Sequence, residues 1–96
     1  MRIYDFAKVD SQGRLCLSGM VEEGETLRPY VDSQHLDTIR LEKVKDENAT
    51  IGKLIKVDKK GRVVIPASFR EFFKLSTVMV SYDDSKDEVV LSLPRA

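Results

Sequence analysis

The chain is poor in residue types that form covalent cross-links or bind metals. Among its 96 residues there are one cysteine, one histidine and no tryptophan. With Cys16 alone, no disulfide can form within the chain, and a reducing cytoplasm fits that composition. His35 lies in a polar stretch with no second histidine or cysteine nearby, so we expect it to face solvent. The sequence therefore predicts no metal site.

Motifs for catalysis and for phosphate binding are also missing. The sequence contains no GxSxG, no GxxxxGK[ST] and no GxGxxG. Nucleophilic catalysis, a phosphate-binding loop and dinucleotide binding therefore lack their usual residues. The many carboxylates fall in predicted turns and exposed strand positions, where hydration explains them. We expect no enzyme, no catalytic residue and no cofactor.

Long apolar runs are the third absence. No stretch approaches the roughly 18 apolar residues of a membrane span, and the first ten residues lack the apolar core of a signal peptide. A content of 42% hydrophobic and 33% charged residues is typical of an ordinary folded domain. We expect a cytoplasmic protein without a membrane partner.

The most informative feature that is present is an internal repeat at a fixed offset along the chain. In the second copy, five residues of the first copy recur as identical residues: Lys8, Val9, Asp10, Gly13 and Arg14 correspond to Lys56, Val57, Asp58, Gly61 and Arg62. A unit of this size buries too little surface to fold alone. We therefore predict a single domain over residues 1–96, made of two interleaved repeats, 1–46 and 50–96.

Alternation of apolar and polar residues predicts β-strands in both repeats. The expected strands span 2–9, 14–17, 27–32, 38–44, 54–57, 62–65, 77–82 and 88–93. Asp and Gly favour tight turns at 10–13 and 58–61, and a third turn is expected at 33–37.

One helix is expected, starting at Pro66. Phe69, Phe72 and Phe73 recur at helical spacing and give this helix an apolar face. The predicted core contains Val57, Ile65, Phe69, Phe72 and Leu91. Cys16 aligns with Val64 and is expected to be apolar core filler.

Charge is distributed unequally between the halves, although the whole chain is neutral. Residues 1–48 contain seven basic and ten acidic residues, net −3, and residues 49–96 contain nine and six, net +3. Between Ile51 and Ile65 there are five cations and one anion, Asp58. This concentration indicates either a site for a polyanion or a solvated hairpin whose lysines protect an exposed edge.

The pattern KVDxxGRVVIP, followed by an amphipathic turn with Arg70 and Glu71 and by two short alternating strands, resembles the AbrB/SpoVT/MazE group of swapped-hairpin DNA-binding proteins. Two copies in one chain resemble the tandem arrangement of MraZ. The first copy departs from the pattern, because Ser18 replaces Pro66 and Glu22 replaces Arg70. The resemblance implies a mainly β fold, a swapped-hairpin AbrB-like β-barrel formed by the two repeats as an intrachain pseudo-dimer, with one short helix in the second repeat.

The resemblance also implies a transcriptional regulator that binds double-stranded DNA, mainly through the second repeat. Resemblance and local charge together nominate these DNA-binding residues: Lys8, Arg14, Lys53, Lys56, Lys59, Lys60, Arg62 and Arg70. The alternative is a protein-interaction module or a MazE-like antitoxin with a toxin protein as partner. The chain stops shortly after the last predicted strand, so we expect no acidic toxin-binding tail, which favours the regulator. Further assembly into a homo-oligomer stays open.

Overall fold

The structure is a computed structural model that describes residues 2–17, 19–46, 48, 52–70 and 77–92, without the side chains of residues 2–5, 36 and 70. Within these residues the chain forms eight strands and one helix, in the order β1 (Arg2–Lys8), β2 (Arg14–Cys16), β3 (Thr26–Asp32), β4 (His35–Val44), β5 (Ile55–Lys56), β6 (Arg62–Val64), α1 (Ala67–Arg70), β7 (Thr77–Asp83) and β8 (Glu88–Ser92). The predicted mainly β class with one short helix is confirmed.

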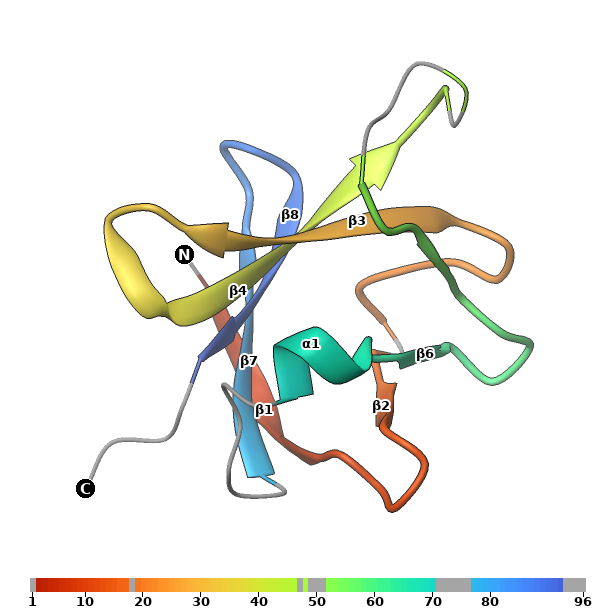
Figure 1. Ribbon diagram of the computed structural model, residues 1–96, viewed down its shortest axis with the longest axis horizontal. Helices are drawn as coiled ribbons and strands as arrows, with labels where there is room; N and C mark the ends of the chain where they lie inside the picture. Colours follow the sequence, from red (N-terminus) through yellow and green to blue (C-terminus); the bar gives the residue numbers. More distant parts are fainter. Residues whose placement is uncertain (1, 18, 47, 49–51, 71–76, 93–96) are drawn as a thin grey trace.

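The strands form a curled six-stranded antiparallel sheet and a separate two-stranded ribbon (Figure 1). The order of the sheet is β1-β7-β8-β4-β3-β5, and the ribbon pairs β2 with β6. β1 therefore pairs with a strand of the second repeat, and β5 pairs with a strand of the first. Exchanging β1 with β5, β3 with β7 and β4 with β8 gives the same order read from the opposite edge of the sheet. This is the strand arrangement of a swapped-hairpin fold.

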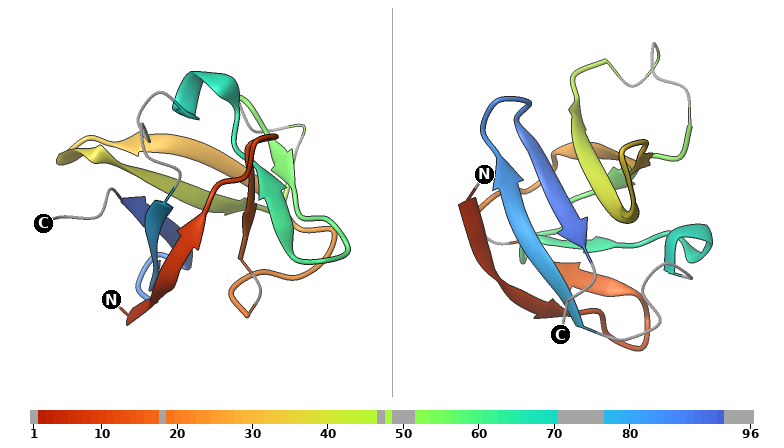
Figure 2. Two further views of the ribbon diagram at one scale, coloured as in Figure 1. Left: turned by 90° about the horizontal axis from the view of Figure 1, so that it is seen from below. Right: turned by 90° about the vertical axis from the view of Figure 1, so that its left-hand side faces the viewer.

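Buried side chains of the curled sheet and of the ribbon belong to one core cluster. Figure 2 shows the curl of the sheet from two further sides. The buried members of the cluster come from both repeats and include Leu15, Leu17, Leu27, Ile39, Leu41, Val63, Val78 and Val89. Of the predicted core residues, Val57, Ile65 and Leu91 are buried, which confirms them. Phe69 is partly buried against this core. Phe72 lies outside the described residues.

Cys16 corrects one expectation, because its side chain is exposed rather than part of the core. Successive side chains of a strand point to opposite faces. Since Leu15 and Leu17 are both fully buried, Cys16 between them must point outward. Val64, the aligned residue, is exposed for the same reason between Val63 and Ile65.

The turn predicted at residues 33–37 is shorter in the structure. Only Ser33 and Gln34 form the turn, and His35 is already the first residue of β4, paired with Asp32. The Asp32 carboxylate accepts a hydrogen bond from the Gln34 amide at 2.9 Å, which closes the reversal in two residues. His35 is exposed, as expected.

The helical content is small in the part of the chain that the structure describes. α1 has four residues, and the Phe69 amide donates to the Pro66 carbonyl at 2.9 Å. No helix among the described residues has the length and apolar character to cross a membrane.

Candidate nucleic-acid interface

The first turn is built around one carboxylate, that of Asp10. Its Oδ1 accepts hydrogen bonds from the amides of Gln12 at 2.8 Å and Arg14 at 2.9 Å. Its Oδ2 accepts a bond from Arg14 Nε at 2.8 Å. Gly13 has a φ of 80°, a backbone conformation that residues other than glycine rarely adopt. One aspartate therefore both closes the turn and holds the arginine that follows it.

The second turn repeats these contacts at the corresponding positions of the second repeat. Asp58 accepts from the Lys60 amide at 2.8 Å, from the Arg62 amide at 2.9 Å and from Arg62 Nε at 3.0 Å. Gly61 has a φ of 75°. The sequence identities between the copies are therefore matched by the same local structure.

Both ion pairs form at the guanidinium Nε. The pKa of Asp10 and that of Asp58 are lowered, chiefly by the hydrogen bonds from the backbone amides of Arg14 and Arg62. Each carboxylate contacts its arginine at Nε, at 2.8 Å for Asp10 with Arg14 and at 3.0 Å for Asp58 with Arg62. A guanidinium held in this way can donate two parallel hydrogen bonds to a phosphate or to the edge of a guanine.

The ribbon places the two arginines on one surface. Leu15 of β2 pairs with Val63 of β6, and both side chains point into the core. The flanking pairs are Arg14 with Val64 and Cys16 with Arg62, all four of which project from the opposite, outer face.

Two hydrogen bonds tie the ends of this ribbon together in a reciprocal way. The Leu17 amide donates to the Gly61 carbonyl, and the Ile65 amide donates to the Gly13 carbonyl, both at 2.8 Å. Each bond becomes the other when its residues are replaced by their counterparts in the other repeat. The arrangement therefore has a local twofold relation centred on the Leu15–Val63 pair.

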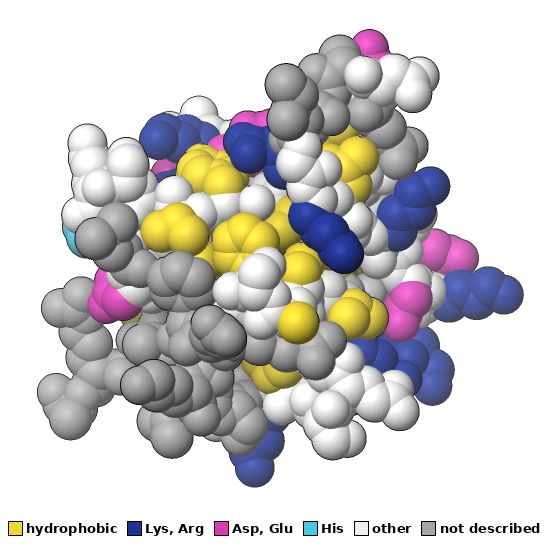
Figure 3. Space-filling view, in the orientation of Figure 1, with side chains coloured by type: hydrophobic (Ala, Val, Ile, Leu, Met, Phe, Trp, Pro, Cys, Tyr) yellow, Lys and Arg dark blue, Asp and Glu magenta, His cyan; other side chains and the backbone are white. Residues whose placement is uncertain are grey.

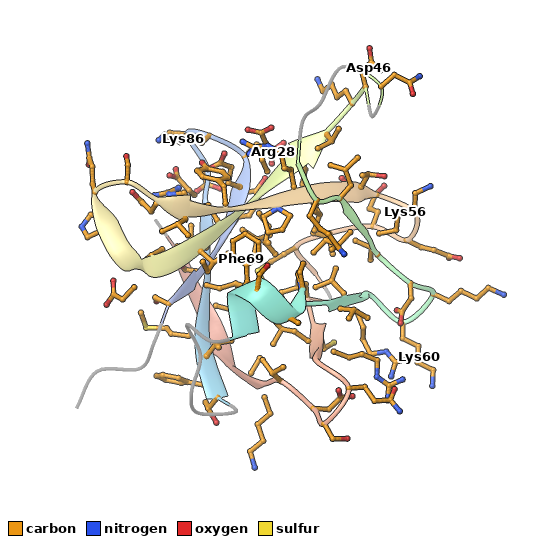
Figure 4. All side chains as sticks on the ribbon, in the orientation of Figure 1. Arg28, Asp46, Lys56, Lys60, Phe69 and Lys86 are labelled. Carbon is orange, nitrogen blue, oxygen red and sulfur yellow. The ribbon has the colours of Figure 1, made fainter. Side chains whose placement is uncertain are left out.

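The predicted lysines surround the turns. Lys8 ends β1, Lys56 ends β5, and Lys53 precedes β5, while Lys59 and Lys60 occupy the second turn, and all five are exposed. Figure 3 shows lysine and arginine side chains, with acidic ones between them, at the right-hand end of the molecule, where the second turn lies, and Figure 4 labels Lys56 and Lys60 there. Arg70 is the last residue of α1, and its side chain lies outside the described part.

The acidic segment of the first repeat lies beside the second hairpin. The Gly24 amide donates to the Val57 carbonyl at 3.0 Å, and the Val57 amide donates to the Glu25 carbonyl at 2.9 Å. Glu22 and Glu23 on this segment are exposed. The backbone that follows these two residues therefore pairs with Val57, the residue after Lys56.

Sequence reasoning missed a polar cluster centred on Arg40. Arg40 Nε donates to Asp32 at 2.8 Å, and its Nη1 donates to Asp83 at 2.9 Å and to Glu88 at 3.3 Å. Tyr30 donates its hydroxyl to Glu88 at 2.7 Å. Glu88 is only 5% exposed, so the expectation that the carboxylates lie in hydrated positions is wrong for this residue.

This cluster shifts the pKa of four of its members, and that of Arg40 is raised by its bonds to the carboxylates, the bond to Asp32 first. The hydrogen bond from Arg40 lowers the pKa of Asp32 to about 2, and bonds from the Ser85 hydroxyl and then from Arg40 lower the pKa of Asp83 to about 2. Burial, followed by the bond to Glu88, raises the pKa of Tyr30 to about 12. Asp32 comes from the first repeat and Asp83 from the second, so the cluster joins the two halves. The only sequence signal was the presence of Asp at the end of both β3 and β7.

Residues 52–85 match a family model described as "MraZ protein, putative antitoxin-like". The match includes Asp58, Arg62 and α1, and it covers roughly a third of the chain. Searches of curated proteins and of solved structures gave no match. Over these residues the chain is similar to a kind of protein described as antitoxin-like. The first repeat lies outside the matched residues.

Proposed function

We propose that the protein is a DNA-binding transcriptional regulator that binds duplex DNA with the outer face of the β2–β6 ribbon. The observation that carries this proposal is the pair of arginines, Arg14 and Arg62, each held at Nε by an aspartate. The major groove of B-DNA admits a two-stranded β-ribbon, and an arginine fork fits the two acceptors of guanine there. The exposed lysines around the turns supply contacts to phosphates, which position a protein on the duplex.

A single chain would provide both halves of the interface. The equivalent turns, the reciprocal ribbon bonds and the strand order, which exchange of the repeats only reverses, support an intrachain pseudo-dimer over residues 1–96. Such a chain would bind an imperfect inverted repeat, since the two copies differ in sequence.

The second turn would bind phosphate more strongly than the first. It carries Lys59 and Lys60 where the first turn carries Ser11 and Gln12. Arg62→Ala should weaken binding at a preferred site by about 1 to 3 kcal/mol more than on random DNA, and Arg14→Ala should have a smaller effect. Equal losses for the two variants would contradict this difference between the turns.

The experiment that tests the proposal is a fluorescence anisotropy titration of the intact chain against random duplex DNA at two salt concentrations, followed by selection of preferred sequences. Binding at low salt that weakens as salt rises is expected. Lys86→Ala is the matched control for the two arginine variants, because it also removes one cation, and Lys86 is exposed and lies away from the second turn (Figure 4). Failure of the folded chain to bind duplex DNA at low salt would refute the proposal.

The second candidate is a protein-interaction module, with a toxin protein as partner and DNA binding secondary. The antitoxin-like description of the matched family favours this candidate. It becomes the better proposal if the folded chain does not bind DNA.

A further inference from the structure

Val64 is an exposed apolar side chain on the outer face of the ribbon, the face that also carries Arg14 and Arg62. It is 47% exposed, whereas its neighbours Val63 and Ile65 are each 1% exposed. A single exposed valine is common in strands and by itself indicates nothing. What distinguishes Val64 is the set of side chains on either side of it.

Val64 lies between cations of the two repeats. On the ribbon it is directly opposite Arg14, and residues opposed in an antiparallel pair project from the same face with Cβ atoms about 4.5 to 5.5 Å apart. On its other side it borders a shallow groove that Lys53, Lys56 and Pro66 also line. A duplex held by these cations would therefore contact the Val64 methyl groups.

The antiparallel ribbon mixes the repeats at each of its ends. With Leu15 and Val63 at the centre, one end presents Arg14 of the first repeat with Val64 of the second. The other end presents Arg62 of the second repeat with Cys16 of the first. The two ends therefore offer an arginine each, but they differ in the apolar neighbour.

We propose, on the basis of the DNA-binding function proposed above, that Val64 is a specificity-determining residue that contacts the 5-methyl group of a thymine in the half-site bound by Arg14. Thymine is the base that presents a methyl group in the major groove, and apolar side chains recognise it there. The half-site at this end of the ribbon is thus read by one residue from each repeat. Arg62 and Cys16 read the other half-site.

The test uses the intact chain and a preferred duplex in which each thymine is replaced in turn by deoxyuridine, which lacks only the methyl group. One replacement should weaken binding by about fourfold, the effect expected for losing one buried methyl contact. Val64→Ala should bind the thymine and deoxyuridine duplexes equally, and Val64→Ile should keep the preference. Phe6→Ala is the control, because Phe6 is the other large exposed hydrophobic residue in the described part of the chain and lies on β1, outside the ribbon. It should leave the preference unchanged.

The assignment of the half-site is tested with the arginine variants. Selection with Arg14→Ala should relax base preference in the half-site that contains the sensitive thymine, and selection with Arg62→Ala should relax the other. Relaxation of the thymine-containing half-site by Arg62→Ala instead, or a thymine preference that survives Val64→Ala, would overturn the inference. Salt-dependent binding without any deoxyuridine effect overturns only the role of Val64, whereas absence of binding overturns the proposed function as well.

Discussion

Replacing Arg40 with methionine should destabilise the protein strongly, because it leaves three carboxylates without their shared cation. The Arg40 side chain is 11% exposed and bonds Asp32, Asp83 and Glu88. Removing one partner of a largely buried ion pair costs about 3 kcal/mol or more. Small domains have a total stability of about 5 to 15 kcal/mol. The melting temperature should fall by roughly 10 to 25 °C for such a loss in a chain of this size.

The pH dependence should change sign in this variant. In the wild type, the pKa values of Asp32 and Asp83 are lowered to about 2, so their pairing stabilises the fold above about pH 4 and is lost as the pH falls toward 2. In Arg40→Met the clustered carboxylates repel one another, which favours the protonated form in the folded state. The folded variant then binds more protons than the unfolded chain, so its stability should rise as the pH falls from 7 to about 4.

Urea unfolding at pH 7 and at pH 4.5 measures both effects. The matched control is Arg28→Met, because Arg28 pairs with Glu42 at 3.3 Å, lies over the Tyr30 ring at 4.8 Å and is 27% exposed, but holds none of the three carboxylates that Arg40 binds. This change should cost less than about 1 kcal/mol. A loss below about 1 kcal/mol for Arg40→Met, or a stability of this variant that does not rise between pH 7 and pH 4.5, would refute the assigned role of the cluster.

Four other predictions address the core, the assembly and the interface. Phe72→Ala should cost about 3 to 5 kcal/mol by chemical denaturation, and a loss under about 1 kcal/mol would place Phe72 on the surface. Residues 49–96 expressed alone should be unfolded or should dimerise in analytical ultracentrifugation, because β5 and β6 pair with strands of the first repeat; a stable monomer would contradict the interleaving. Lys59→Ala with Lys60→Ala should reduce the slope of log affinity against log salt by up to about 2, and an unchanged slope would exclude phosphate contacts at this turn. Asp58→Asn should weaken binding at a preferred site more than on random DNA, since Arg62 loses its positioning partner; equal losses would assign Asp58 to folding alone.

The outer face of the β2–β6 ribbon was predictable only in part from the sequence. The turns and their aspartates could be located from the sequence, because an aspartate bonds amides two and four residues away whatever the rest of the chain does. The nominated cations Arg14 and Arg62 could be located in the same way. That these two arginines share one face depends on the pairing of β2 with β6, which joins segments from different repeats.

What the sequence determined by itself was the local structure: the β class, the positions of the two tight turns and most of the strands. These follow from alternation and turn chemistry, which act over a few residues. The outward direction of Cys16 was also contained in the alternation with Leu15 and Leu17, although its alignment with Val64 led to the wrong expectation.

The tertiary structure alone decided which segments pair. It placed the segment at Glu25 beside Val57, gathered the partners of Arg40 from both repeats, and set Val64 next to Arg14. Such contacts depend on the burial of one core to which both halves of the chain contribute. The entropy cost of closing long loops between paired strands is recovered only when the whole core forms. No local pattern in either repeat therefore specifies these contacts.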